Sequence, residues 1–179
     1  MSDAAGLPFG AAIRDLRADD VDRLLAFINP LIAEDTFIDM SGRPLTLAEE
    51  SAFVQQRRAE MALGDNVMRL AVAADAVLAT GELRRLPGRR RHVAELGVAV
   101  SAEHRDQGLG TAMVEDLCAQ SRRLGVRRLV LRVFSVNERA QQVYRNCGFT
   151  ECGRIPQMVH YRGEDVDEVW MARAVERVG

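Results

Sequence analysis

The chain contains no lysine, since all 24 basic residues among its 179 residues are arginines. A phosphate-binding P-loop ends in a lysine, pyridoxal-phosphate enzymes hold their cofactor through a lysine Schiff base, and protein kinases pair a strand lysine with ATP. The composition therefore excludes these three classes. Any phosphate that this chain binds must be held by arginine, by backbone N–H groups or by a metal ion.

Cysteine is also scarce, with only Cys118, Cys147 and Cys152 present. The number is odd, and the first residues, MSDAAGLPFG, lack the basic and apolar regions of a secretory signal. We therefore expect a cytoplasmic protein with free thiols. The spacing of these cysteines and His160 matches no zinc pattern. The sequence thus predicts no metal site, and the three cysteines are expected to be small core residues.

Long apolar runs and an excess of charge of one sign are absent as well. No segment reaches the roughly 18 apolar residues that span a membrane, so we expect no membrane partner. The 24 basic and 26 acidic residues give a net charge of −2. Nucleic-acid-binding proteins usually carry a basic excess, so we expect no nucleic-acid partner.

The hydrophobic pattern predicts one α/β (α+β) domain over residues 11–179, preceded by a flexible N-terminus at 1–10. Strands are expected at 11–17, 67–74, 77–86, 92–100, 128–134, 150–161 and 166–174. Helices are expected at 20–33, 46–63, 109–124 and 137–146, where Thr46 and Glu49 have the spacing of a capping box. The order β-α-α-β-β-β-α-β-α-β-β indicates a mixed, largely antiparallel sheet of about seven strands with about four flanking helices.

The segment RDQGLGT, residues 105–111, joins a predicted strand to a predicted helix. A helix start has unpaired N–H groups and a partial positive charge, and the glycines at 108 and 110 let a phosphate approach them closely. The segment therefore predicts a pyrophosphate site without lysine, or else only a glycine-assisted turn. A dinucleotide-binding fold is disfavoured because Met113 stands where the third glycine of that motif belongs.

RDQGLG resembles the R/Q-x-x-G-x-G/A signature of the GNAT superfamily of N-acetyltransferases. NERAQQVYRNCGF, which begins at Asn137, is similar to the N-x-x-A-x-x-x-Y-x-x-x-G-F segment of the same family. The resemblance covers roughly residues 67–174 and implies a sheet whose central strands splay apart. It also implies transfer of an acetyl group from acetyl-CoA to a primary amine, by direct attack in a ternary complex and without a metal.

The resemblance further implies which residues contact the acetyl-CoA. The diphosphate would lie on the 105–110 loop, and backbone amides at 98–100 would pair with the pantetheine arm. The implied contacts are Val98, Ala99, Val100, Arg105, Asp106, Gln107, Gly108, Leu109, Gly110, Thr111, Asn137, Ala140 and Tyr144.

Tyr144 is the implied general acid that protonates the departing thiolate. Asn137, Ala140 and Tyr144 have a spacing that puts them on one helix face, although Tyr144 could be a core residue and Asn137 a helix cap. Glu95, beside the expected acetyl-CoA, is the first candidate for the general base. Glu82 and His92 are the alternatives, and some relatives use no dedicated base.

The resemblance implies an acceptor site shaped by the segment between the first two helices and by the loop between the last two strands. The candidate residues there are Glu34, Asp35, Phe37, Asp39, Glu164 and Asp165; Glu34, Phe37 and Glu82 are the predicted acceptor contacts. These carboxylates suit a small cationic amine or an amino acid. A protein or peptide N-terminus remains an alternative acceptor, and an acyl-CoA-binding sensor remains an alternative function. The arginines at 84–91 are interpreted as a solvated hairpin. The oligomeric state is left open, and a homodimer is one alternative because family members often dimerise.

Overall fold

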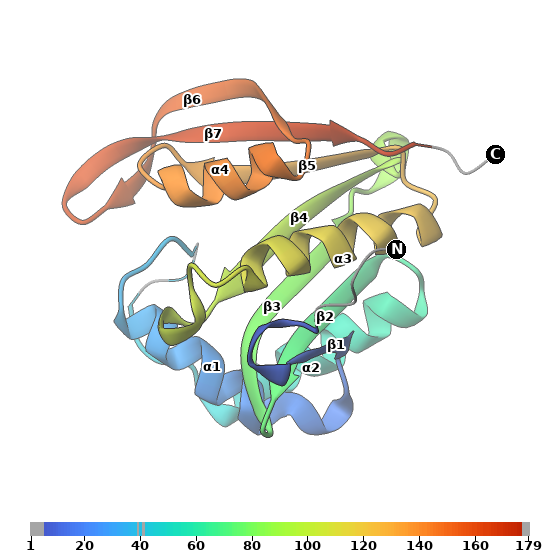
Figure 1. Cartoon of the computed structure of the whole chain (residues 1–179), viewed down its shortest axis with the longest axis vertical. Coiled ribbons are helices and arrows are strands. Elements are labelled where there is room, and N and C mark those ends of the chain that lie inside the picture. The colour runs from blue at the N-terminus through green and yellow to red at the C-terminus, as the bar shows by residue number, and fades with distance from the viewer. Residues whose placement is uncertain (1–5, 39, 41, 177–179) are drawn as a thin grey trace.

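Seven strands form one sheet in the order β1-β2-β3-β4-β5-β7-β6 in the computed structural model, which describes residues 6–38, 40 and 42–176 (Figure 1). The strands are β1 Ala12–Asp15, β2 Asn66–Ala73, β3 Ala76–Arg85, β4 Val93–Val100, β5 Arg128–Phe134, β6 Thr150–Tyr161 and β7 Glu164–Ala174. The helices are α1 Val21–Ala33, α2 Leu47–Ala62, α3 Leu109–Arg123 and α4 Glu138–Asn146. The predicted fold class and element order are confirmed.

The centre of the sheet opens between β4 and β5. These two strands are parallel and pair only over Val93–Glu95 against Arg128–Val130, whereas every other neighbouring pair is antiparallel. Figure 1 shows the two strands meeting at one end and diverging, with α3 beside the gap. The predicted splay of the central strands is confirmed, and it leaves one edge of β4 without a strand partner beyond Glu95.

The helices cover opposite faces of the sheet. Side chains alternate along a strand, so Gly81 and Leu83 of β3 share one face and Glu82 and Arg84 share the other. A Cβ atom on Gly81 would lie 2.8 Å from Met113 of α3, which puts α3 on the first face. The helices α1 and α2 pack against the second face, where a cluster including Leu24, Val54 and Met68 is buried.

Helix caps fix the starts of α2 and α4. Thr46 Oγ1 accepts a hydrogen bond from the Glu49 N–H, and Glu49 Oε2 accepts one from the Thr46 N–H at 2.8 Å, so the predicted capping box is present. Asn137 Oδ1 accepts a hydrogen bond from the Ala140 N–H at 3.1 Å. Each bond satisfies a donor that a helix start would otherwise leave unpaired.

All three cysteines are free, and Cys118 and Cys147 are buried as expected. Cys152 is exposed, so the expectation of a core residue there is wrong. It lies in β6, an edge strand whose residues are almost all exposed, and an edge strand has no neighbour on one side to bury its side chains. Among the described helices, none combines the length and the apolar character of a membrane span.

Residues 1–5 of the predicted flexible N-terminus and the acceptor candidate Asp39 lie outside the described residues. Within the N-terminus, Pro8–Gly10 forms a short 3-10 helix, and the Phe9 ring packs edge-on against His104 with centroids 4.6 Å apart. The division into 1–10 and 11–179 stays a prediction.

Candidate active site

The loop before α3 prepares a row of backbone donors. Gly108 is the N-cap of α3 and adopts φ +86°, a left-handed conformation that favours glycine. The first helical hydrogen bond runs from the Ala112 N–H to the Gly108 carbonyl at 3.0 Å. The N–H groups of Leu109, Gly110 and Thr111 precede that bond, and no acidic residue lies in the first turn of α3. The helix start therefore suits an anion.

The missing side chains of the two glycines keep this helix start open. A Cβ atom on Gly108 would meet only Pro8 Cγ at 4.0 Å, and one on Gly110 would meet only Val100 Cγ2 at 3.7 Å. Protein atoms therefore do not require glycine at position 110, and the space that a methyl group would fill belongs to the cavity beside the loop. This is the geometry expected of a cradle for a phosphate.

Arg105 ties this loop to β4 and to the end of α1. Its Nε donates to the Val100 carbonyl at 3.1 Å, and its Nη2 donates to Glu34 Oε2 at 2.7 Å. The hydrogen bond from Arg105 to Glu34 lowers the pKa of the Glu34 carboxyl despite its partial burial. Glu34, predicted as an acceptor contact, is therefore an ion-pair partner of the predicted phosphate-binding arginine.

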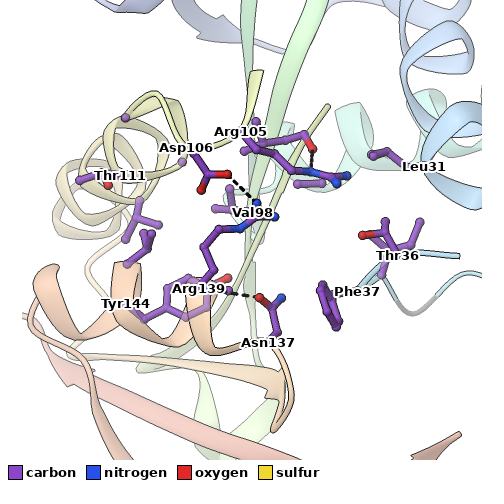
Figure 2. A pocket seen from close by; sticks show the side chains of 18 residues that line it. Leu31, Thr36, Phe37, Val98, Arg105, Asp106, Thr111, Asn137, Arg139 and Tyr144 are labelled. Atoms are coloured by element: carbon purple, nitrogen blue, oxygen red, sulfur yellow. Dashed lines mark hydrogen bonds and ion pairs between the residues drawn. The ribbon is translucent and has the colours of Figure 1, made fainter. Parts of the chain in front are cut away.

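A second arginine approaches the loop from α4. Arg139 Nη1 donates to Asp106 Oδ2 at 3.0 Å, as the dashed line in Figure 2 shows. Asp106 alone would repel a phosphate, because both are negatively charged. The Arg139 guanidinium offsets that repulsion, so two guanidinium groups, Arg105 paired with Glu34 and Arg139 paired with Asp106, lie at this loop.

The open edge of β4 offers further backbone donors. The Ser101 N–H donates to the Leu78 carbonyl, and the Val93 carbonyl accepts from Leu86, so Val93, Ser101 and the alternate residues between them face β3. The N–H groups of Val98 and Val100 consequently point to the gap between β4 and β5. Ala99, also predicted to contribute a backbone amide, directs its own N–H towards β3.

The helix α4 brings its signature residues to the same gap. Asn137, Ala140 and Tyr144 share one face, as their spacing predicts, and Figure 2 shows Asn137 and Tyr144 on the side facing Phe37 and the 105–111 loop. Tyr144 is only 8% exposed, and its ring meets Phe149 with centroids 6.0 Å apart. Burial raises the pKa of the Tyr144 hydroxyl to about 12, so this group keeps its proton at neutral pH.

These elements enclose a narrow cavity of about 160 Å³ (Figure 2). Eleven predicted acetyl-CoA contacts line it: Val98, Ala99, Val100, Arg105, Asp106, Gly108, Gly110, Thr111, Asn137, Ala140 and Tyr144. The side chains of the other two do not. Leu109 is fully buried in the core, and Gln107 is exposed, with its Nε2 donating to the Glu103 carbonyl at 3.2 Å.

A wide cavity of about 620 Å³ adjoins the narrow one on the face covered by α1 and α2. The two cavities share seven wall residues: Phe37, Ile38, Val98, Ala99, Asn137, Ala140 and Tyr144. The gap between β4 and β5 therefore connects a phosphate-sized cradle on one side with a larger chamber on the other, and Tyr144 borders both.

The sequence model of the Acetyltransferase (GNAT) family matches residues 35–149, which include the 105–111 loop and the whole of α4. The chain belongs to this family. Its fold and cavities therefore belong to an acetyltransferase, and the expectation drawn from the two signature segments is confirmed.

Known relatives resemble this acetyltransferase in sequence and in fold. The L-amino acid N-acetyltransferase AaaT of Escherichia coli K12 is 34% identical over 86 residues, which are 48% of this chain and 53% of the relative. The matched segment thus spans about half the length of that curated relative.

Among solved structures, a GNAT-family acetyltransferase from Streptococcus pneumoniae superimposes with a TM-score of 0.83 at 23% identity, covering 93% of this chain and 99% of the other. A phosphinothricin acetyltransferase from Sinorhizobium meliloti, solved in complex with acetyl-CoA, gives a TM-score of 0.81 at 19% identity, covering 92% and 88%. At these identities the two structures support the fold.

In this acetyltransferase both predicted bases on the sheet are held by arginines. Glu95 lies on the wall of the wide cavity and accepts hydrogen bonds from Arg84 Nη2 and Arg132 Nε, each at 2.7 Å. Burial alone would raise the pKa of the Glu95 carboxyl, but these two hydrogen bonds outweigh it and lower the pKa. Glu95 is therefore a carboxylate at neutral pH.

Glu82 lies on the same wall as Glu95. Its Oε1 accepts a hydrogen bond from Asn66 Nδ2 at 2.6 Å and lies 2.8 Å from Arg57 Nε. His92, the third candidate, is exposed in the turn before β4 and borders neither cavity. The geometry thus brings Glu95 and Glu82 to the chamber and leaves His92 outside it.

Of the other predicted acceptor residues that the structure describes, only Phe37 lines a cavity. Its ring packs at a tilt against Tyr161 with centroids 4.9 Å apart and edge-on against Phe134, and of these rings Phe37 and Phe134 line the wide cavity. The exposed acids Asp35, Glu164 and Asp165 lie outside both walls, and Asp165 instead pairs with His160 at 2.8 Å.

The interpretation of 84–91 as a purely solvated hairpin is incomplete. Arg84 lines the wide cavity, and Arg85 donates to the Leu124 carbonyl at 2.8 Å, which anchors the hairpin to the end of α3. Both side chains find acceptors because β4 and the end of α3 lie directly beside β3.

Several wall residues carry no sequence signal. Arg139 and Thr36 border the narrow cavity, and Glu50, Arg132 and Glu168 border the wide one. Alternation along β5 could have placed Arg132 on the same face as Phe134, but nothing local indicates that Glu50 on α2 faces a chamber. Within the described ranges, no group of three or more histidine, cysteine or acidic side chains is arranged to hold a metal ion.

Proposed function

We propose that this protein is an acetyl-CoA-dependent N-acetyltransferase that acetylates a small primary amine or amino acid by direct attack in a ternary complex. One observation carries the proposal. A narrow cavity beside a phosphate cradle meets a wide cavity at the gap between β4 and β5, and Tyr144 borders both. Two substrates entering from opposite faces would meet there.

The acetyl-CoA would occupy the narrow cavity. The N–H groups at the start of α3 would hold its diphosphate, with Arg105 and Arg139 supplying the positive charge. The N–H groups of Val98 and Val100, which point to the gap, would pair with the pantetheine arm. One of these amides would also stabilise negative charge that develops on the thioester oxygen.

The Tyr144 hydroxyl would donate a hydrogen bond to the departing sulfur. In the reaction the amine nitrogen forms a bond to the acetyl carbon and loses one proton, the carbon–sulfur bond breaks, and the departing thiolate takes up one proton from water to end as a thiol. A hydroxyl whose pKa is about 12 keeps its proton throughout the physiological range and is available as a donor.

Glu95 is the proposed acceptor of the proton that the amine loses, acting through water in the wide cavity. Its carboxylate is fixed by Arg84 and Arg132 and lies on β4, two residues from Gly97 at the gap. Glu82 is the alternative, since it lies on the same wall.

The wide cavity supports a small acceptor. A volume of about 620 Å³ falls in the range of small-molecule sites. The similarity to an L-amino acid N-acetyltransferase over 86 residues supports the same class. A protein or peptide N-terminus is the second candidate acceptor.

The test is a thiol-release assay on the purified protein with acetyl-CoA and a panel of alkylamines, amino acids and N-terminal peptides, with mass detection of each product. We expect turnover on a free amine or amino acid in preference to peptides. Acetyl-CoA binding without turnover on any member would overturn the proposal in favour of a sensor. A preference for peptides would favour the second acceptor class.

A further inference from the structure

The wide cavity contains a buried carboxylate that has no partner among the residues that the structure describes. Glu50, in the first turn of α2, is 4% exposed and lines this cavity. Across the described residues, no side chain forms a hydrogen bond or ion pair with its carboxylate. Burying an unpaired charge is costly, and buried polar groups in native proteins are nearly always paired.

The other carboxylates of the same wall make Glu50 an exception. Glu49 pairs with Arg43, Glu82 with Arg57, and both Glu95 and Glu168 with Arg132. Each of these carboxylates is thus balanced by a guanidinium from the chain itself. For Glu50, the described part of the chain supplies no such cation, although the start of α2 contributes a partial positive charge.

The surroundings of Glu50 indicate the shape of what would pair with it. The same cavity wall contains the apolar residues Leu24, Phe27, Ile28, Phe53 and Met68. An apolar stem that ends in a cationic nitrogen satisfies both features, since the stem buries hydrophobic surface and the nitrogen pairs with the carboxylate.

The position of α2 separates this site from the reacting groups. The helix packs against β2, which lies two strands away from β4 in the sheet. Neighbouring strands are about 4.8 Å apart, so β2 and β4 are separated by roughly 10 Å. The nitrogen at Glu50 is therefore a second nitrogen of the acceptor, not the one that attacks at the gap beside Tyr144.

We infer that Glu50 is a specificity-determining residue that binds a second, cationic nitrogen of the acceptor. The acceptor class is a diamine, or an amino acid with a basic side chain, in which an apolar stem separates two amines. The inference rests on the proposed function and names the substrate class of the same site.

Matched acceptors test it. Lysine and norleucine share a straight side chain of four carbons, but only lysine ends in an ammonium group; 1,5-diaminopentane and pentylamine form the corresponding pair without a carboxylate. We expect kcat/KM for the member with two amino groups, in at least one pair, to be about tenfold or more above that for its partner. The lysine pair tests the amino-acid class and the diamine pair tests the simple amine class.

The variant Glu50→Gln keeps the shape of the side chain and removes the charge. In the pair for which the wild-type protein discriminates, we expect this variant to bring the ratio of the two kcat/KM values close to 1. The kcat/KM for norleucine or pentylamine should stay nearly unchanged. Glu115→Gln, at an exposed position on α3, is the matched control and should keep the wild-type ratio. A loss of activity on both members of a pair would instead indicate that Glu50 supports the fold.

The outcomes separate the two proposals. Turnover with equal efficiency on both members of both pairs in the wild-type protein overturns the role of Glu50 and leaves the acetyltransferase intact. Without turnover on any amine the proposed function fails, and calorimetric titration of 1,5-diaminopentane and pentylamine into the wild-type protein and the Glu50→Gln variant still tests the site. Equal affinities of the wild-type protein for the two amines would then refute it.

Discussion

The hydroxyl of Tyr144 can be removed with little disturbance to the packing around it. Tyr144→Phe keeps the buried ring and its edge-on contact with Phe149. The change therefore isolates the contribution of one oxygen atom at the junction of the two cavities.

The raised pKa sets the expected size of the effect. With a pKa of about 12, the hydroxyl is a weaker acid than an ordinary thiol of pKa about 8.5, so moving its proton fully to the sulfur costs roughly 5 kcal/mol. Tyr144 therefore acts mainly by donating a hydrogen bond as charge develops on the sulfur. A hydrogen bond to a charged group contributes about 1.5–3 kcal/mol, so we expect kcat to fall by roughly 10- to 150-fold.

The assay is the initial rate of thiol release with both substrates saturating, together with KM for acetyl-CoA and thermal unfolding. Tyr161→Phe is the matched control, because Tyr161 is the second of the two tyrosines in the chain and borders neither cavity. The KM for acetyl-CoA and the melting temperature should stay close to the wild-type values. A kcat within about twofold of wild type would refute the role of the hydroxyl, because loss of a transition-state contact must lower kcat.

Further changes test the other parts of the site. Glu95→Gln should lower kcat/KM by about 100-fold. The factor should be nearly constant between about pH 5 and 8, because the lowered pKa keeps Glu95 ionised there. If the variant's pH–rate profile loses an inflection near neutrality that the wild-type profile shows, this expectation is wrong. Gly110→Ala should raise KM for acetyl-CoA by about tenfold, or roughly 1.4 kcal/mol, without loss of thermal stability, since the added Cβ lies 3.7 Å from Val100 Cγ2. Gly108→Ala should instead destabilise the fold by about 1–2 kcal/mol because of its left-handed φ, and equal melting temperatures for the two glycine variants would be inconsistent with this distinction. Thr46→Ala should remove the cap of α2 and lower the melting temperature by about 2–4 °C, as about 1 kcal/mol predicts, with kcat unchanged.

The local features of the fold could be read from the sequence because each has a local cause. The capping box at Thr46 and Glu49 forms between residues three apart, and the spacing of Asn137, Ala140 and Tyr144 fixes one helix face whatever the rest of the chain does. The narrow cavity was predictable for the same reason, since the elements around the β4–α3 loop and α4 contribute most of its wall.

The wide cavity depends on contacts between distant segments, and these left little trace in the sequence. Arg84 comes to Glu95 across eleven residues, and Arg132 comes to it across thirty-seven. Glu34 was expected at the acceptor but meets Arg105, seventy-one residues away. A charge in a loop indicates that the loop is polar, but the partner of that charge is decided by how the helices cross the sheet.

Because β4 and β5 pair over only three residues, the sheet consists of two halves, β1–β4 and β5–β7. On the carboxyl side of Glu95, no backbone hydrogen bond joins β4 to β5, and a cluster of apolar side chains around Leu117 of α3 connects the two halves. The width of the gap is therefore set by side-chain volume and not by strand spacing. Repacking the members of this cluster that border neither cavity, such as Leu117 and Leu129, would change how far apart the two substrates are held, so residues remote from the site also determine its geometry.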